Sequence, residues 1–242
     1  GKRQEVHLAA ARIRRLAAMG EDVSQMAVVY PKQSGYGALL QNILPMYGLA
    51  TYVAEKRKAG AHPLSRFILS ALAAISAGWR LSDILECAQS GFLGLTQEAL
   101  DRFCTYCEGA DVRGEAMRKP FRYPKGVTEE ALGALEESRK QVMEPLLALQ
   151  RGLQAAKTAD DTIQTILTLL ESVHAYETLE DMRDELNAAD LAAEAQDCAQ
   201  VWNAMMTTLD QLHTLLGGQA VPAKIVLELL QNGLSALELA AL

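Results

Sequence analysis

The segment FCTYC, residues 103–107, holds the pair of residues whose types and spacing most directly suggest chemistry. Cys104 and Cys107 stand in the C-x-x-C arrangement that redox dithiols share with one half of a four-cysteine metal site. Such a metal site needs a second pair, or histidines at fixed spacing, and the other two cysteines, Cys87 and Cys198, are isolated in the sequence. The pair by itself therefore does not define a metal site.

The neighbours of these cysteines favour a packing role. Leu100 and Phe103 precede them at the i, i+3, i+4, i+7 spacing that places all four side chains on one helix face. Cysteine packs on such a face as a small apolar residue. A redox dithiol is expected at a helix N-terminus, where the thiolate is stabilised, whereas this pair lies late in its predicted helix. We favour core packing, with a metal or redox site as the alternative.

Acidic pairs and histidines are the other residues that could bind a metal or transfer protons. Asp160-Asp161 falls at a predicted helix start, where free backbone N–H groups stabilise carboxylates, and Asp181, Asp184 and Glu185 share a polar helix face. The histidines are scattered singly: His7, His62, His174 and His213. The sequence contains no Walker loop, dinucleotide-binding fingerprint or zinc-protease motif. We therefore predict no catalytic residue and no metal-binding residue in this chain.

A cationic loop between Gly109 and Gly126 is the best candidate for contact with nucleic acid. Its five basic residues are Arg113, Arg118, Lys119, Arg122 and Lys125. Phe121 and Tyr123 interleave with them, which could combine base stacking with phosphate contacts. The alternative is a solvated loop whose aromatic side chains are tucked into the core. We predict the five cations as DNA-binding residues.

Composition and charge narrow the class of protein. Half of the 242 residues are hydrophobic and only 5% are aromatic, a bias that favours helix because Ala and Leu dominate. The net charge of −7 does not mark the whole chain as a nucleic-acid binder, although it can hide local patches. No apolar run approaches the roughly 18–20 residues of a membrane span. Four scattered cysteines fit a reducing cytoplasm, and we expect a cytoplasmic protein without a membrane partner.

The predicted fold is mainly α, with a small α/β portion of two short strands at the N-terminal end. Met26–Tyr30 is an apolar run that ends at Pro31 and predicts a buried strand, and Gly48–Val53 predicts a turn followed by a second strand. After Gly60 the pattern is helical throughout. We expect a partial α/β segment over residues 1–60 and an all-helical domain over 61–242. The first and last residues suggest an internal fragment of a longer protein.

Several short motifs appear in an order that resembles one family, the B subunit of the bacterial AddAB (RexAB) helicase–nuclease. They are Tyr47-Gly48-Leu49, Glu55-Lys56-Arg57, His62-Pro63-Leu64, Trp79 with Asp83-Ile84-Leu85, Gln89–Leu95, Asp101-Arg102-Phe103 with Tyr106, and Val112-Arg113-Gly114. The match covers roughly residues 5–125, and residues 126–242 match by helical pattern and by Leu230–Leu237. Three of the motifs depart from the family pattern: Ser90-Gly91-Phe92 stands for T-G-L, Phe103-Cys104-Thr105-Tyr106 stands for L-E-N-Y, and Val112 stands for the isoleucine of a G-I-x-G loop.

This resemblance implies the helical 2B domain of a UvrD-like second motor half, preceded by part of domain 2A. It implies a subunit that repairs double-strand breaks as a heterodimer with an AddA-like helicase–nuclease subunit and acts on DNA in the full complex. The matched motifs contain no catalytic residue. The family's Mg²⁺-dependent nuclease and 4Fe–4S cluster are expected outside this span, so Cys104 and Cys107 are not assigned to the cluster.

Three functions stay open at this point. The first is a non-catalytic DNA-channel and subunit-contact segment of an AddB-like subunit. The second is a stand-alone helical protein-interaction adaptor without a nucleic-acid role. The third is an enzyme with its own site, for example a metal hydrolase on the acidic stretch 160–200, which holds eleven acidic residues against the single base Arg183.

Overall fold

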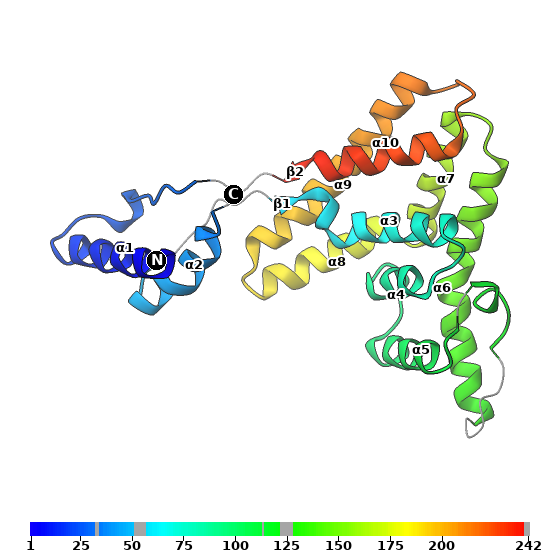
Figure 1. Ribbon diagram of the computed structural model, residues 1–242, viewed down its shortest axis with the longest axis horizontal. Coiled ribbons are helices and arrows are strands. Elements are labelled where there is room, and N and C mark those ends of the chain that lie inside the picture. Colours follow the sequence, from blue (N-terminus) through cyan, green and yellow to red (C-terminus); the bar gives the residue numbers. More distant parts are fainter. Residues whose placement is uncertain (32–33, 51–56, 113, 122–127, 240–242) are drawn as a thin grey trace. The chain divides into compact units, whose positions relative to one another are not determined.

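The computed structural model describes the chain except for residues 32–33, 51–56, 113, 122–127 and 240–242 (Figure 1). The chain divides into two compact units, one built from residues up to Lys56 and one that begins at Arg57. Each unit has its own hydrophobic core. We describe them one after the other.

The prediction of a mainly α fold is confirmed. The helices of the described residues are α1 Lys2–Ala18, α2 Tyr36–Ile43, α3 Pro63–Ser76, α4 Leu81–Gln89, α5 Gln97–Gly109, α6 Glu129–Ala155, α7 Ala159–Ser172, α8 Ala175–Ala188, α9 Ala192–Leu216 and α10 Ala223–Ala236. None of the helices within the described ranges combines the length and the apolar character that a membrane crossing requires.

Local capping sets the start of several helices in the larger unit. The hydroxyls of Thr96 and Thr128 accept hydrogen bonds from the backbone N–H groups of Ala99 and Ala131, in the first turns of α5 and α6. Each bond satisfies a helix N–H that has no partner inside the helix. Pro63 occupies the first position of α3, where its missing N–H costs nothing. The same starts are predicted from the sequence, because Pro63 suits a first helical position and Thr96 and Thr128 suit N-caps.

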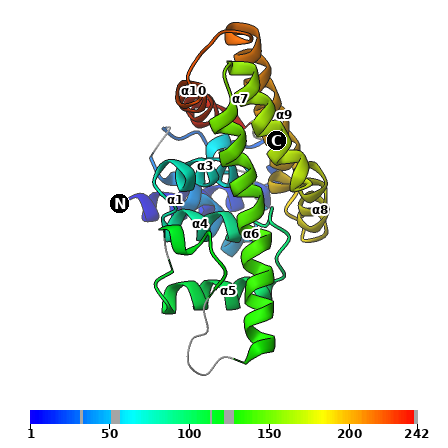
Figure 2. The same ribbon diagram turned by 90° about the vertical axis from the view of Figure 1, so that its right-hand side faces the viewer.

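The core of the larger unit is organised around α6, which is 27 residues long. Helices α4 and α5 lie beside its amino-terminal part and α7 beside its carboxy-terminal part (Figures 1 and 2). Fully buried side chains from several helices fill the space between them, including Phe67, Phe103, Met143, Ile166 and Met205. This packing gives the α5–α6 connection a rigid frame.

A small antiparallel sheet joins the beginning of the larger unit to its end. Strand β1, Arg57–Lys58, pairs with β2, Glu238–Leu239, in the register Arg57 to Leu239. The Arg57 guanidinium reaches α9, where its Nε lies 2.7 Å from Asp197 Oδ2 and its Nη1 lies 2.7 Å from Glu194 Oε1. The sequence predicts only helices for residues 61–242, but strand β2 lies within that range.

The smaller unit is a helix pair. Val6 and Ala10 of α1 are buried against Leu40 and Ile43 of α2. The turn after α2, η2 (Leu44–Tyr47), is fastened to α1, because Arg14 donates a hydrogen bond to the carbonyl of Tyr47. Apolar burial and polar contacts such as this one fix the two helices against each other.

The predicted strand at Met26–Tyr30 is wrong. Met26 has extended backbone but donates its N–H to Val23 of the preceding turn η1 (Val23–Gln25), and Val29 is 94% exposed. A strand needs the backbone of a neighbouring strand, and the described part of this unit supplies none. In the second predicted strand, residues 51–53 lie outside the described residues. The assignment of 1–60 and 61–242 to two domains stays a prediction.

Candidate nucleic-acid interface

The candidate interface is the segment Gly114–Phe121 between α5 and α6, which we call the cationic turn. It begins with the 3-10 turn η4 (Gly114–Ala116). Arg118 and Lys119 are both exposed, while Met117 between them and η4 is fully buried. The buried methionine holds the backbone on the core, so two adjacent cations face solvent.

The cationic turn is fastened to the helical frame at three points. Gly114 N donates to the carbonyl of Trp79 at 3.0 Å. The Met117 carbonyl accepts from Arg139 Nη1 at 3.2 Å, and Phe121 N donates to Glu136 Oε2 at 3.0 Å. Both of these charged partners belong to α6. The turn is thus held by the polar groups of a helix and not only by its own residues.

Glu136 and Arg139 form a tight pair beneath the turn. Arg139 Nε donates to both carboxylate oxygens of Glu136 at 2.9 Å, and the side chain of Arg139 is only 9% exposed. Burial acts to raise the pKa of Glu136, but hydrogen bonds from Arg139 and from Phe121 N–H outweigh it and hold that pKa below its ordinary value. The carboxylate therefore stays ionised under the turn.

Phe121 is part of the core. Its ring is 8% exposed and packs against Tyr106 and Phe103, with centroids 4.7 Å and 6.2 Å away, and the Arg139 guanidinium lies 6.0 Å from its centroid. A buried ring cannot stack on a nucleic-acid base, so the stacking role considered for Phe121 is wrong and the core alternative holds for it. Tyr123 lies outside the described residues.

The structure brings two of the five predicted DNA-binding residues together. Arg118 and Lys119 lie side by side on the cationic turn, and Arg118 Nη1 is 2.8 Å from Glu115 Oε1 of the same turn. The other three predicted residues lie outside the described residues: Arg113, Arg122 and Lys125. The described part of the site is therefore an exposed pair of cations with one local acid.

Sequence reasoning missed Arg139 as part of this site. A signal was present, because Arg139 continues the spacing of Leu135, Val142 and Leu146 on the buried face of α6. A charged residue at a core position of a helix requires a buried partner. The surrounding letters EESRKQ look like an exposed helix surface, and this appearance hid the exception.

The C-x-x-C pair lies on α5, close to this turn, and does not form a reactive site. Cys107 is fully buried and burial raises its pKa to about 12, while Cys104 is half-buried and burial raises its pKa as well. Both are free thiols. A protonated thiol is a poor nucleophile and a poor metal ligand, so the geometry agrees with the core-packing interpretation.

Two of the acidic and histidine candidates, Asp161 and His62, serve helix starts. Asp161 completes a capping box with Thr158 at the start of α7, and hydrogen bonds from the backbone N–H of Lys157 and from Thr158 lower its pKa. His62 Nδ1 accepts from Leu64 N at 3.2 Å at the start of α3, and burial lowers its pKa to about 4. Within the described residues no group of three or more His, Cys, Asp and Glu could hold a metal ion.

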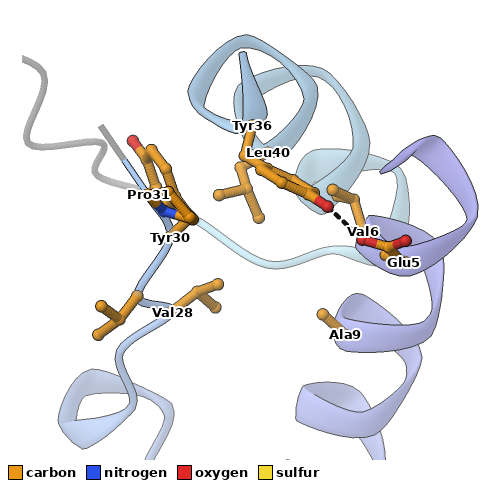
Figure 3. Close-up of a pocket in the computed structure, with 9 residues that line it drawn as sticks. Glu5, Val6, Ala9, Val28, Tyr30, Pro31, Tyr36 and Leu40 are labelled. Carbon is orange, nitrogen blue, oxygen red and sulfur yellow. Dashed lines mark hydrogen bonds between the residues drawn. The ribbon is translucent and has the colours of Figure 1, made fainter. Parts of the chain in front are cut away.

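The smaller unit contains a pocket of about 270 Å³ that sequence reasoning also missed. The pocket is lined by apolar groups of α1, of α2 and of residues 28–31, among them Val6, Val28 and Leu40 (Figure 3). The Tyr36 hydroxyl donates to the carboxylate of Glu5 across its floor. Among the described lining residues, the one acidic group is thus engaged by a tyrosine.

Comparison with known proteins identifies relatives of the chain. It is 24% identical to the B subunit of an ATP-dependent helicase/deoxyribonuclease of Clostridium botulinum over 88% of its length, which is 20% of that protein. Proteins of the same name from Symbiobacterium thermophilum and Lysinibacillus sphaericus are 27% and 26% identical over 98% of the chain and 22% of their own length. No family model matches the chain.

The chain spans about a fifth of the length of the curated relatives it matches. Their shared name agrees with the family that the order of the motifs indicates. The resemblance is confirmed: the chain is homologous to a segment of the B subunit of the ATP-dependent helicase/deoxyribonuclease.

Proposed function

We propose that this chain is a non-catalytic, DNA-contacting segment of an AddB-like helicase–nuclease subunit that acts in double-strand break repair. The observation that carries the proposal is the cationic turn, where two adjacent exposed cations stand on a backbone fastened to the core. Homology to subunits named for helicase and deoxyribonuclease activity supports DNA as the polyanion.

The physical role of the cationic turn would be a phosphate contact. Arg118 and Lys119 can neutralise phosphates without reading the base sequence, because phosphate oxygens are alike at every nucleotide. Arg113, Arg122 and Lys125 are proposed as further phosphate contacts on the strength of the sequence alone. Because the ring of Phe121 is buried and cannot stack on a base, we propose contacts with the phosphate backbone of DNA.

Helix α1 is a second candidate surface for DNA. Arg12 and Arg15 are exposed three residues apart on one face of it. Helix α8 has the opposite character, since Glu177, Asp181 and Asp184 are exposed on it and would repel phosphate. We assign α8 to solvent or to the AddA-like partner subunit.

The proposal leaves the chemistry to other parts of the complex. Mg²⁺ and the 4Fe–4S cluster of the resembled family would be held outside this chain, which would itself need no cofactor. The complex would work in the cytoplasm. Stoichiometric metal on the purified chain would argue instead for the metal-hydrolase alternative.

Charge reversal on the cationic turn tests the proposal. The variant Arg118→Glu/Lys119→Glu should weaken binding of the full chain to duplex DNA by at least about tenfold at low salt. The matched control is Arg151→Glu/Lys224→Glu, which reverses two exposed cations on α6 and α10. Equal affinities of the two double variants would contradict the proposal and favour the helical adaptor without a nucleic-acid role.

A further inference from the structure

We infer that Glu136 and Arg139 are positioning residues of the DNA interface: this pair, a buried arginine with a half-buried glutamate, holds the cationic turn in the conformation that presents Arg118 and Lys119. The inference rests on the proposed function. It names two residues that would touch no DNA themselves and would act through the turn.

The hydrogen bonds of the pair are divided between its members and the turn. Arg139 uses Nε and Nη2 for Glu136, and its Nη1 donates to the carbonyl of Met117. Glu136 accepts from Phe121 N with the same carboxylate. Each charged group therefore satisfies the other and fixes one backbone position of the turn.

The two fixed positions bracket the exposed cations. Met117 comes directly before Arg118, and Phe121 comes two residues after Lys119. With the Met117 carbonyl and the Phe121 N–H both held, the backbone between them has few alternatives. A preorganised turn loses less conformational entropy when its side chains bind phosphates, so it binds them more tightly.

Burial of Arg139, whose side chain is 9% exposed against 21% for Glu136, argues for a role in specifying a conformation. A buried ion pair contributes little net stability, because desolvation of both charges offsets their attraction. An apolar residue in place of Arg139 would extend the stripe of Leu135, Val142 and Leu146 on α6. What apolar residues could not do is bind the backbone of a polar turn, and this is the task that the pair performs.

The pair could instead serve only the packing of α5 against α6, since Arg139 also lies over the Phe121 ring at 6.0 Å. That role would lower stability in a variant without a specific effect on the cations. The two roles are separated by asking whether the effect of a variant on DNA binding requires Arg118 and Lys119 to be present.

The experiment combines amide hydrogen exchange with a double-mutant cycle on the full chain. Arg139→Met removes the hydrogen bonds and keeps an apolar stem, and Arg102→Met is the control, because it breaks the exposed pair with Glu98 on α5. Arg139→Met should speed exchange of the Phe121 amide at least about tenfold relative to core amides of α9. Arg102→Met should leave the exchange rate of the Phe121 amide unchanged.

In the cycle, binding to duplex DNA is measured for Arg139→Met with and without Arg118→Ala/Lys119→Ala. Arg139→Met should weaken binding by about three- to tenfold when both cations are present and by less than about 1.5-fold when they are absent, since coupled residues are non-additive. Glu136→Gln keeps a side-chain oxygen for Phe121 N and should give a smaller effect in the same direction. If Arg139→Met does not fold, Glu136→Gln replaces it in both the exchange and the binding measurements.

Two results would overturn the inference. Unchanged exchange of the Phe121 amide in Arg139→Met and Glu136→Gln would show that the pair does not hold the turn. An equal loss of affinity with and without the two cations would show a purely structural role. If Arg118→Ala/Lys119→Ala itself leaves affinity unchanged, the proposed function fails, and faster exchange would still support the anchoring of the turn.

Discussion

The acid within the cationic turn offers a sharp test, because replacing it should improve DNA binding. Glu115 Oε1 lies 2.8 Å from Arg118 Nη1, and the two side chains are 67% and 39% exposed. Any phosphate that engages Arg118 must compete with this carboxylate and is repelled by it. Glu115→Gln removes the charge and keeps the shape of the side chain.

The size of the gain follows from the exposure of the pair. An exposed ion pair contributes about 0.2–1 kcal/mol, so releasing Arg118 from it should tighten DNA binding by about 1.5- to fivefold at low salt. The gain should shrink as salt rises, because screening weakens both the pair and the repulsion. The free energy of unfolding should fall by no more than about 1 kcal/mol, the upper end of what an exposed pair contributes.

The assay is a fluorescence-anisotropy titration of labelled duplex DNA at several salt concentrations. The matched control is Glu98→Gln on α5, since Glu98 is also exposed and paired with an arginine, Arg102, at 2.6 Å. The control should bind as the unchanged protein does. Weaker or unaltered binding by Glu115→Gln at the lowest salt would refute a phosphate contact at Arg118.

Three further predictions concern the larger unit. Ile166→Ala on α7 empties a fully buried position and should lower the free energy of unfolding by about 2–5 kcal/mol in a urea titration; a loss below about 1 kcal/mol would contradict the packing. Asp160 accepts a hydrogen bond from His213 and raises its pKa, so the pair should stabilise the protein below about pH 6.5 and lose this effect as pH rises through the raised value. The melting temperatures of His213→Ala and the unchanged protein should therefore differ at pH 6 and converge at pH 9, and a constant difference would reject the linkage. Native Cys107 should resist iodoacetamide at pH 8 while half-buried Cys104 reacts faster, and equal rates, read by mass spectrometry, would be inconsistent with the burial.

Local signals predicted the helices well. The starts at Pro63, Thr96 and Thr128 coincide with those of the structure, because a cap or a fixed φ acts within a few residues of itself. The pair Asn232-Gly233 predicts a helix end near Asn232, and this prediction is wrong, since α10 continues to Ala236. Its buried Leu234 packs with the core, and this contact outweighs the local preference of Asn-Gly for a turn.

Strands depend on partners that are distant in the sequence, and for this reason one of the strand predictions failed. Met26–Tyr30 has the composition of a strand but no neighbour in the described part of its unit, whereas β1 and β2 have little strand character and pair across about 180 residues. No local pattern could join Lys58 to Glu238. The apolar run alone could not distinguish a buried strand from an extended segment with an exposed valine.

Only those features of the candidate site that are local in the sequence could be predicted. A cluster of cations is visible in one dimension, and Arg118 and Lys119 indeed lie together in space. The burial of Phe121 and the pairing of Glu136 with Arg139 depend on how α5, α6 and the turn fold onto one another. Those contacts are tertiary, so only the structure could show that the loop is fastened.

The most direct test of DNA contact at the cationic turn is the salt dependence of binding. The slope of log Kobs against log salt concentration is measured on duplex DNA for the unchanged chain and for Arg118→Ala/Lys119→Ala. If each cation neutralises one phosphate, the magnitude of the slope should fall by about 1.8, that is about 0.9 for each contact. An unchanged slope would contradict the account, because it would show that neither cation displaces counterions from DNA.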